Sequence, residues 1–476
     1  MKPSFSLIAF AIALVALPAF AAGKPHIVLV MADDQGWGQT SYNGHPQLKT
    51  PHLDALASGG LRFNRFYAGA SNCSPSRATV LTGRTNDRTG VFNHGFPLRL
   101  QENTIAEALQ KAGYATGHFG KWHLNGLRGP GAPVLATDSH NPGAFGFDHW
   151  LTATNFFDRD PLLSRMGEFE AFTGDSSEVA VREAVKFIQE KASDQPTFTV
   201  IWFGTPHSPF VASEEDKAPF KSLPENYQNQ YGEIIALDRS IGDLREGLAD
   251  AGIAEDTLIW YCSDNGGLAE FGPETMGGLR GSKNTMYEGG LRVPGIIHWP
   301  AKIKEGRVTD SIAGTVDIFP TIAEIVELPS DSILKPYDGI SLVSLINGRE
   351  TKRKKALPFR HDGRGVLVEN RYKLLYQKNK YELYDLNSDP EESVNLIESN
   401  PKVAARMKAD YEAWDKSVEA SLAGKDYESG VVDPDQPERR YWHTDPAYAP
   451  FLEELMKRPE YGPWIERQNK PKRKKK

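Results

Sequence analysis

The chain has 476 residues, with 55 lysines and arginines against 62 aspartates and glutamates, and its formal net charge is −7. This balance argues against a nucleic acid as the main ligand, and a polyanionic ligand would have to be met by a local group of cations. Two cysteines exclude a disulfide framework. The length is sufficient for one large domain with a smaller partner.

The N-terminal residues have the pattern of an export signal. Lys2 precedes a mostly apolar run from Phe5 to Leu17, and Ala19-Phe20-Ala21 fits the small-x-small rule for cleavage. The run is too short to anchor the chain in a bilayer, and nothing later in the sequence resembles a membrane helix. We therefore expect residues 1–21 to be removed from a protein that is periplasmic or extracellular, without a membrane anchor.

Strand and helix patterns then alternate along the chain. The apolar run His26–Met31 is typical of a strand covered on both faces, and Thr104 to Glu107 form a capping box ahead of a helix that Gly113 ends. The other expected elements are helices at 51–58, 177–191 and 231–248 and strands at 116–119, 198–203 and 258–262. This alternation predicts an α/β fold with a large doubly wound mixed sheet sandwiched by helices.

Polar residues follow four of these strands at the point where each strand ends. They are Asp33 and Asp34, Lys121 and His123, His207, and Asp264 and Asn265. Ligands of open α/β sheets bind outside the carboxyl ends of the strands, so these residues should converge on one site. The carboxylate and amide oxygens suit Ca²⁺ or Mg²⁺ better than zinc. Lys121 and His123 would point the same way if the backbone between them is extended.

A further stretch, Cys73-Ser74-Pro75-Ser76-Arg77 with Leu81-Thr82-Gly83-Arg84, predicts a short helix. Ser74 suits the N-cap, Pro75 the first helical position and Gly83 the left-handed residue after the helix. Cys73 would then lie just outside a helix N-terminus, where the dipole and Arg77 favour an anion. A lone cysteine is more often a buried core residue, and that is how we interpret Cys262, which lies in a predicted strand.

The stretch from Cys73 to Arg84 resembles the signature of the type I sulfatases in the alkaline phosphatase superfamily. In that family a formylglycine-generating enzyme oxidises this cysteine to formylglycine, whose hydrated aldehyde attacks sulfur with one oxygen and expels sulfate with the other. Asp33-Asp34-Gln35-Gly36 and Asp264-Asn265-Gly266 are similar to the family's metal-binding motifs. The resemblance implies one Ca²⁺ per chain, bound by Asp33, Asp34, Asp264, Asn265 and the oxygen derived from Cys73.

The resemblance also implies roles for the remaining polar residues. Lys121 and Lys283 would contact the sulfate, Arg77 would add a fixed positive charge, and His123 would take a proton as sulfate leaves. His207 lies between Pro206 and Pro209, in a stiff loop that suits a general acid. Lys283 precedes the glycine-rich segment Glu288-Gly289-Gly290, which matches the region that carries the family's second sulfate-binding lysine.

The resemblance is dense over residues 24–325 and thinner to about residue 400. We expect a catalytic domain at 22–350 and a C-terminal subdomain at 351–469, with short antiparallel strands at 365–368, 372–376 and 381–385 and a helix at 401–422. Residues 423–469 show no clear period, and they either wrap the domain or rim the cleft. Residues 470–476 are expected to be a disordered basic tail.

Three functions remain open on the sequence. Sulfate-ester hydrolysis on a sulfated carbohydrate or polysaccharide is the first, because the chain is exported and has many Trp and Tyr residues outside the motifs. Phosphate or phosphonate ester hydrolysis is the second, although no additional His/Asp set suggests a two-zinc site. A non-catalytic carbohydrate-binding protein is the third, if Cys73 stays unmodified. The sugar and the sulfate position depend on loops 91–98, 125–140, 155–172 and 271–278, and the oligomeric state is unknown.

Overall fold

The computed structural model describes residues 23–157, 159–350 and 352–469. The predicted export signal and the predicted basic tail lie outside the described residues. Within the described part of the chain, no helix combines the length and the apolar character needed to cross a bilayer.

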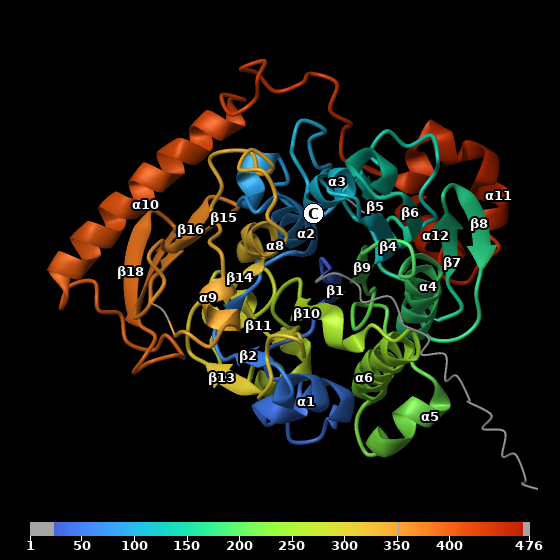
Figure 1. Cartoon of the computed structure of the whole chain (residues 1–476), viewed down its shortest axis with the longest axis horizontal. Coiled ribbons are helices and arrows are strands. Elements are labelled where there is room, and N and C mark those ends of the chain that lie inside the picture. The colour runs from blue at the N-terminus through green and yellow to red at the C-terminus, as the bar shows by residue number, and fades with distance from the viewer. Residues whose placement is uncertain (1–22, 158, 351, 470–476) are drawn as a thin grey trace, which may run out of the picture.

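A ten-stranded mixed sheet forms the centre of the molecule (Figure 1). The five strands from β10 to β6 are parallel to their neighbours, while β12 and β7 join them antiparallel on the two sides. In spatial order the strands are β13 (Arg307–Thr309), β2 (Leu61–Phe63), β12 (Gly295–His298), β10 (Thr257–Ser263), β1 (His26–Ala32), β9 (Thr197–Trp202), β4 (Ala115–Lys121), β6 (His149–Ala153), β7 (Leu162–Arg165) and β8 (Glu168–Ala171). The predicted doubly wound mixed sheet is confirmed.

Helices cover both faces of this sheet. One face carries α1 (Pro51–Ser58), α4 (Ser176–Lys191) and α6 (Glu225–Asp250), and the other carries α2 (Cys73–Thr82), α3 (Ile105–Lys111) and α8 (Ile318–Ile325). Successive side chains of β1 enter opposite cores: Ile27 and Leu29 pack with α2, α3 and α8, whereas Val28 and Val30 pack with α1, α4 and α6. This double burial explains the unbroken apolar run of β1.

The chain beyond residue 350 forms a second, antiparallel sheet. Its strands are β15 (Leu357–His361), β16 (Arg364–Val368), β17 (Tyr372–Gln377) and β18 (Lys380–Asp385), and α10 (Pro401–Leu422) packs against it. Three strands and the helix match the predicted ranges closely, and β15 is an additional strand. The smaller elements are β3 (Phe66–Tyr67), β11 (Arg292–Val293), β14 (Ala313–Gly314), α5 (Glu214–Lys217), α7 (Glu288–Leu291) and α9 (Val343–Ile346).

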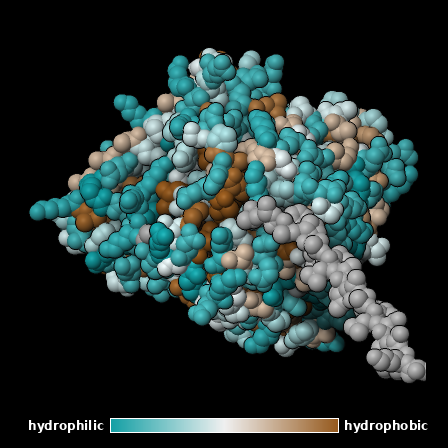
Figure 2. Space-filling model, in the orientation of Figure 1, coloured by the Kyte–Doolittle hydropathy of each residue, from teal (hydrophilic) through white to brown (hydrophobic). Residues whose placement is uncertain are grey.

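After α10 the chain crosses the molecule to the other end of the large sheet (Figure 1). There β19 (Arg440–Tyr441) pairs with β5 (Leu127–Arg128), and α11 (Leu452–Leu455) and α12 (Gly462–Asn469) pack beside it. Figure 2 shows the same face of the molecule as largely hydrophilic, with an apolar strip near its middle in the region where Figure 1 places α8.

Candidate active site

The parallel strands bring the predicted polar residues to one edge of the sheet. Ala32 is the register partner of Ser263, so the residues that follow β1 and β10 lie side by side. The Asp264 amide donates to the Ala32 carbonyl over 3.0 Å, and the Asp33 amide donates to the Thr205 carbonyl after β9 over 3.0 Å. These main-chain bonds fix the loops that carry the acids.

Acidic, amide, thiol and imidazole side chains meet at this edge. Single ligand atoms of Asp33, Asp34, Cys73 and His207 lie within 4.8 Å of one another. Asn265 donates from Nδ2 to Asp34 Oδ1 over 2.7 Å, while its own Oδ1 is buried and has no partner among the described residues. This unpaired amide oxygen and the buried carboxylates beside it together offer hard oxygen donors, which fit Ca²⁺.

Each carboxylate is paired with a cation. Lys121 Nζ lies 2.5 Å from Asp33 Oδ2, and Lys283 Nζ lies 2.7 Å from Asp34 Oδ2. Burial acts to raise the pKa of both acids, but the lysine charges hold each pKa below its usual range. Asp264 differs, because burial and then the neighbouring Asp33 charge raise its pKa. The centre therefore holds closely matched positive and negative charge.

Arg77 lies behind this centre rather than facing a substrate. Its side chain is fully buried, and it is not among the residues that line the cavity described below. One guanidinium nitrogen donates to Asp264 Oδ2 over 2.7 Å and another to the Lys121 carbonyl over 3.3 Å. The guanidinium is thus engaged with Asp264 and with the main chain at Lys121, and the role of Arg77 toward a substrate anion stays a prediction.

Cys73 is the first residue of α2, and Asn72 is the N-cap. The prediction that Ser74 caps the helix was wrong, because the Ser74 hydroxyl accepts the Gly95 amide over 2.8 Å instead. Gly83, with φ of 67°, ends the helix as predicted. Cys73 Sγ is buried 3.6 Å from Asp33 Oδ1, and burial strongly raises the pKa of its thiol. An unmodified thiol with this pKa would be a poor nucleophile at neutral pH.

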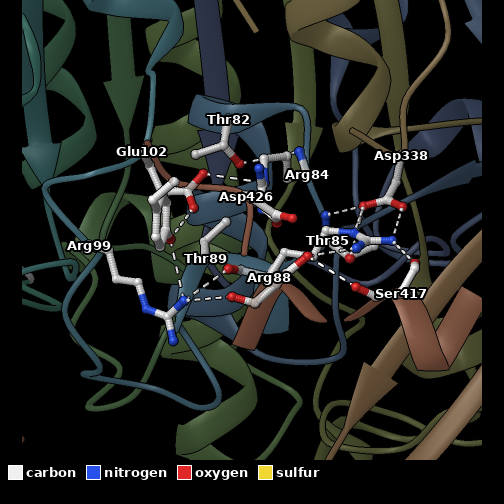
Figure 3. Close-up of polar contacts among 12 residues, drawn as sticks. Thr82, Arg84, Thr85, Arg88, Thr89, Arg99, Glu102, Asp338, Ser417 and Asp426 are labelled. Carbon is white, nitrogen blue, oxygen red and sulfur yellow. Dashed lines mark hydrogen bonds and ion pairs between the residues drawn. The ribbon is translucent and has the colours of Figure 1, made fainter. Parts of the chain in front are cut away.

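A buried polar network holds the far end of α2 (Figure 3). Arg84 lies 3.3 Å from Glu102 and 2.6 Å from Asp426, and Arg88 lies 2.9 Å from Asp338. Asp338 Oδ2 also accepts a hydrogen bond over 2.8 Å from the amide of Thr85, which lies just beyond the helix. The ion pair with Asp426 and a bond from Arg88 to α10 connect the helix that carries Cys73 to the C-terminal region.

The two histidines differ in their surroundings. Both ring nitrogens of His123 are buried without a partner among the described residues, and burial and then Lys121 lower its pKa well below the usual range. His207 donates from Nδ1 to the Ser208 carbonyl over 2.6 Å, which leaves Nε2 3.7 Å from Asp34 Oδ2. Its ring stacks on Phe156 with centroids 4.6 Å apart. Burial and then Lys283 lower the pKa of His207, and Asp34 opposes them.

The turn that presents His123 is not extended. Strand β4 ends at Lys121, and His123 has a left-handed φ of 57°. Both side chains reach the site, but not through the alternation that we predicted. Asp34, with φ of 67°, is a second left-handed residue at the centre. Such strained backbone is concentrated at functional sites.

Lys283 is positioned by two glycine-rich segments that touch. Its amide donates to the Gly267 carbonyl over 2.9 Å. A Cβ at Gly266 would lie 1.9 Å from the Gly289 carbonyl oxygen, so only glycine fits there. The glycines after Asn265 and Glu288 therefore permit the close approach that holds Lys283 beside Asp34.

A cavity of about 450 Å³ opens above these residues. It is lined by four predicted residues, Cys73, His123, His207 and Lys283. The lining residues that sequence reasoning missed are Asn72, Asn93, His94, Arg128, Gly129, Asn155, Phe156, Asn284, Tyr441, Trp464 and Gln468. Loops 91–98, 125–140 and 155–172 contribute as expected, whereas 271–278 does not. Residues 423–469 both wrap the domain and rim the cavity.

Comparisons with known proteins agree with this arrangement. The chain matches the family model described as Sulfatase over residues 25–328 and the one described as N-sulphoglucosamine sulphohydrolase, C-terminal, over residues 281–416. It is 30% identical to N-acetylgalactosamine-6-sulfatase of Canis lupus familiaris over 401 residues, 75% of this chain and 72% of that protein. It is also 30% identical to arylsulfatase A of Homo sapiens over 454 residues, 80% of this chain and 86% of that protein.

Among solved structures, the crystal structure of Ps i-CgsB is similar with a TM-score of 0.75 and 24% sequence identity. The similarity covers 94% of this chain and 100% of that chain. At this identity the likeness concerns the fold alone.

Proposed function

The chain belongs to the sulfatase family and hydrolyses sulfate esters, and we propose that it does so with a formylglycine made from Cys73 and one bound Ca²⁺. The observation that carries this proposal is the placement of Cys73. It lies on the first turn of α2 beside Asp33, with a buried thiol whose pKa is strongly raised. The surroundings disfavour a thiolate, yet they gather acids and lysines around this one position.

The calcium ligands would be Asp33, Asp34, Asp264, Asn265 and the oxygen at position 73. The free Oδ1 of Asn265 and the close approach of Asp33 and Asp34 support this set. Bound Ca²⁺ would supply positive charge to the sulfate oxygens. Lys121 and Lys283 would contact the same sulfate, and Arg77 would hold Asp264 in place through its 2.7 Å bond.

Formylglycine would supply a hydrated aldehyde oxygen as the nucleophile toward sulfur. His207 would act as the imidazolium, whose Nδ1 proton is bound to the Ser208 carbonyl and whose Nε2 proton passes to the leaving oxygen of the substrate. Asp34, whose Oδ2 lies 3.7 Å from Nε2, favours this charged form. His123 is buried and neutral, so it can accept a proton from the hydroxyl at position 73 as sulfate departs. The separate positions of the two histidines support separate proton transfers.

We further propose that the substrate is a sulfated carbohydrate or polysaccharide. Tyr441 and Trp464 are aromatic residues of the cavity lining, and Asn93 and Asn155 offer amides suited to hydroxyl groups. A relative that is 30% identical is named for N-acetylgalactosamine 6-sulfate chemistry. The proposal includes maturation by a formylglycine-generating enzyme, export after removal of residues 1–21, a catalytic domain at 22–350 and a subdomain at 351–469.

The alternative of a two-zinc phosphate or phosphonate hydrolase has less support. Within the described residues, the single group of His, Cys, Asp and Glu side chains able to share a metal contains one histidine, His207. Zinc sites in proteins are built largely from histidine and cysteine, whereas calcium sites use oxygen.

The test is peptide mass spectrometry of protein from a host that has a formylglycine-generating system. We expect the Cys73 peptide to be lighter by the thiol-to-aldehyde change, while the peptide with Cys262, the other buried cysteine, keeps its thiol. Sulfate release from defined sulfated saccharides is measured on the same sample. Full activity with only a thiol at Cys73 would overturn the mechanism, and full modification without sulfate release would favour a binding protein.

A further inference from the structure

An arginine that pairs with no acid among the described residues lies in the wall of the cavity. Arg128 is half-buried, and its guanidinium lies over the Tyr441 ring at 4.7 Å from the centroid. Its Nε is buried with no hydrogen-bond partner, and among the described residues no carboxylate forms an ion pair with it. By contrast, Lys121, Lys283 and Arg77 each contact an aspartate at the catalytic centre.

The hydrogen bonds of His94 show that its ring is neutral and leaves the Arg128 charge unchanged. Arg128 Nη2 lies 3.2 Å from His94 Nε2, and because a guanidinium only donates, Nε2 must accept. His94 Nδ1 lies 2.9 Å from Asn93 Oδ1 and therefore carries the proton. The ring is thus neutral, in agreement with a pKa lowered to about 4 by burial and then by Arg128 and Arg439. Arg439, which stacks on Phe96 at 4.6 Å, adds a second cation nearby.

The fold holds Arg128 at a fixed place relative to Cys73. Arg128 and Tyr441 are register partners in the pairing of β5 with β19. A Cβ at Gly95 would lie 2.6 Å from Arg128 Cγ, and the Gly95 amide is bound by Ser74, the neighbour of Cys73. The His94 ring lies between Arg128 and the catalytic centre, with its centroid 6.5 Å from that of His123. The guanidinium and the reacting group are therefore parts of the wall of one cavity of about 450 Å³.

We propose that the sugar carrying the scissile sulfate, or the unit next to it, bears a second anionic group that Arg128 binds. This inference rests on the proposed function and narrows its substrate class. A guanidinium presents its donors as a planar fork that matches a carboxylate or a sulfate. Tyr441, which packs edge-on against Trp464 with centroids 5.4 Å apart, holds that fork in orientation. A second sulfate and a uronic carboxylate share this chemistry.

The test uses matched pairs of sulfated saccharides with the scissile sulfate at the same position. In one pair, one member has an additional carboxylate, and in the other pair, one member has a second sulfate. The two pairs therefore distinguish a carboxylate from a sulfate as the group that Arg128 binds. We expect the enzyme to prefer the doubly charged member of one pair. Arg128→Gln should lower kcat/KM on that member roughly 10- to 100-fold more than on its partner, chiefly through KM. Arg128→Lys should restore part of the preference.

Arg62→Gln is the matched control, because Arg62 is also half-buried and lies 5.3 Å from the Tyr42 centroid, outside the cavity. It should leave the preference unchanged. The inference would be overturned if the unaltered enzyme showed no preference, or if Arg128→Gln lost activity equally on all substrates. The measurement on the unaltered enzyme is valid even if a variant fails to fold. An aryl sulfate is assayed as a further substrate, so that failure of this inference can be told apart from failure of the proposed function. If enzyme carrying formylglycine releases no sulfate from any ester, the proposed function itself is refuted.

Discussion

Asn265 donates its amide to Asp34 Oδ1 over 2.7 Å, and the same Nδ2 lies 3.0 Å from the Gly266 carbonyl, so the side-chain oxygen of Asn265 is left buried without a partner among the described residues. The two bonds fix which atom of the amide is nitrogen. The remaining oxygen is thereby held in place, and an unpaired buried acceptor costs about 1–3 kcal/mol unless a ligand satisfies it. The arrangement is one that a bound cation would complete.

The first prediction follows from this oxygen. Asn265→Ala should weaken Ca²⁺-dependent sulfate release by at least about 100-fold, with partial recovery at high Ca²⁺, because one neutral ligand is lost. Activity is measured against free Ca²⁺ after chelation. Asn64→Ala, at a half-buried asparagine bonded to the exposed Asp310, is the control and should behave like the unaltered enzyme. Full recovery of chelated enzyme with Zn²⁺ alone would instead favour the phosphatase alternative.

The second prediction concerns the support of α2. Asp338 accepts bonds from Arg88, Thr85 and Trp414, so one buried carboxylate joins the end of α2 to α10 (Figure 3). Asp338→Asn keeps the shape but leaves Arg88 buried without its counter-charge. We expect the free energy of unfolding to fall by about 3–5 kcal/mol at neutral pH, measured by urea denaturation. Asp310→Asn, at an exposed acid, should change it by less than about 0.5 kcal/mol.

The third prediction is a pH dependence of stability. Glu288 and Glu392 are buried on either side of Lys373, whose Nζ lies 3.0 and 2.8 Å from them. One lysine cannot offset two carboxylates, and burial, together with the Glu288 charge, raises the pKa of Glu392 to about 7. The folded protein thus keeps a proton that the unfolded chain loses at about pH 4.3.

This contribution to stability is present below about pH 4.3 and is lost as the pH rises through about 7, with a slope of up to about 1.4 kcal/mol per pH unit. Glu392→Gln should remove that slope between pH 6 and pH 8. The measurement compares free energies of unfolding at the two pH values. Equal slopes in the unaltered protein and the variant would show that Glu392 does not hold the proton.

Much of the fold could be predicted because its signals are local. The capping box from Thr104 to Glu107 forms as expected, α10 has the predicted bounds, and the apolar run of β1 lies between two helical layers. The convergence of Asp33 with Asp264 followed from a topological rule, since both follow parallel neighbours.

What could not be predicted depends on contacts between distant parts of the chain. Asn72 and Ser74 are both suitable caps, and only the Gly95 amide decides that Ser74 is used elsewhere. Strand β15 was missed because Pro358 is unusual in strands, yet β15 is an edge strand, where proline is tolerated. Arg128 and Tyr441 meet through a pairing of two-residue strands, for which a sequence gives no periodic signal.

The last prediction separates the two histidines. His207 Nε2 is directed at the site while Nδ1 is bound to the Ser208 carbonyl, so it is placed to protonate a leaving oxygen. A sugar alkoxide needs that proton far more than an aryl oxide of low pKa. His207→Ala should therefore depress hydrolysis of a sugar sulfate about 100-fold more than that of an activated aryl sulfate.

His123 should act after the leaving group has gone, because its neutral ring, which has no partner among the described residues, can accept the proton that accompanies sulfate release. His123→Ala should slow both substrates alike and leave sulfate bound to the peptide that contains residue 73, which mass spectrometry detects. His45→Ala is the control for loss of a buried imidazole, since His45 lies outside the cavity and bonds the Leu48 amide. Equal losses on both substrates in His207→Ala, with no difference in retained sulfate between the variants, would show that the two roles are assigned wrongly.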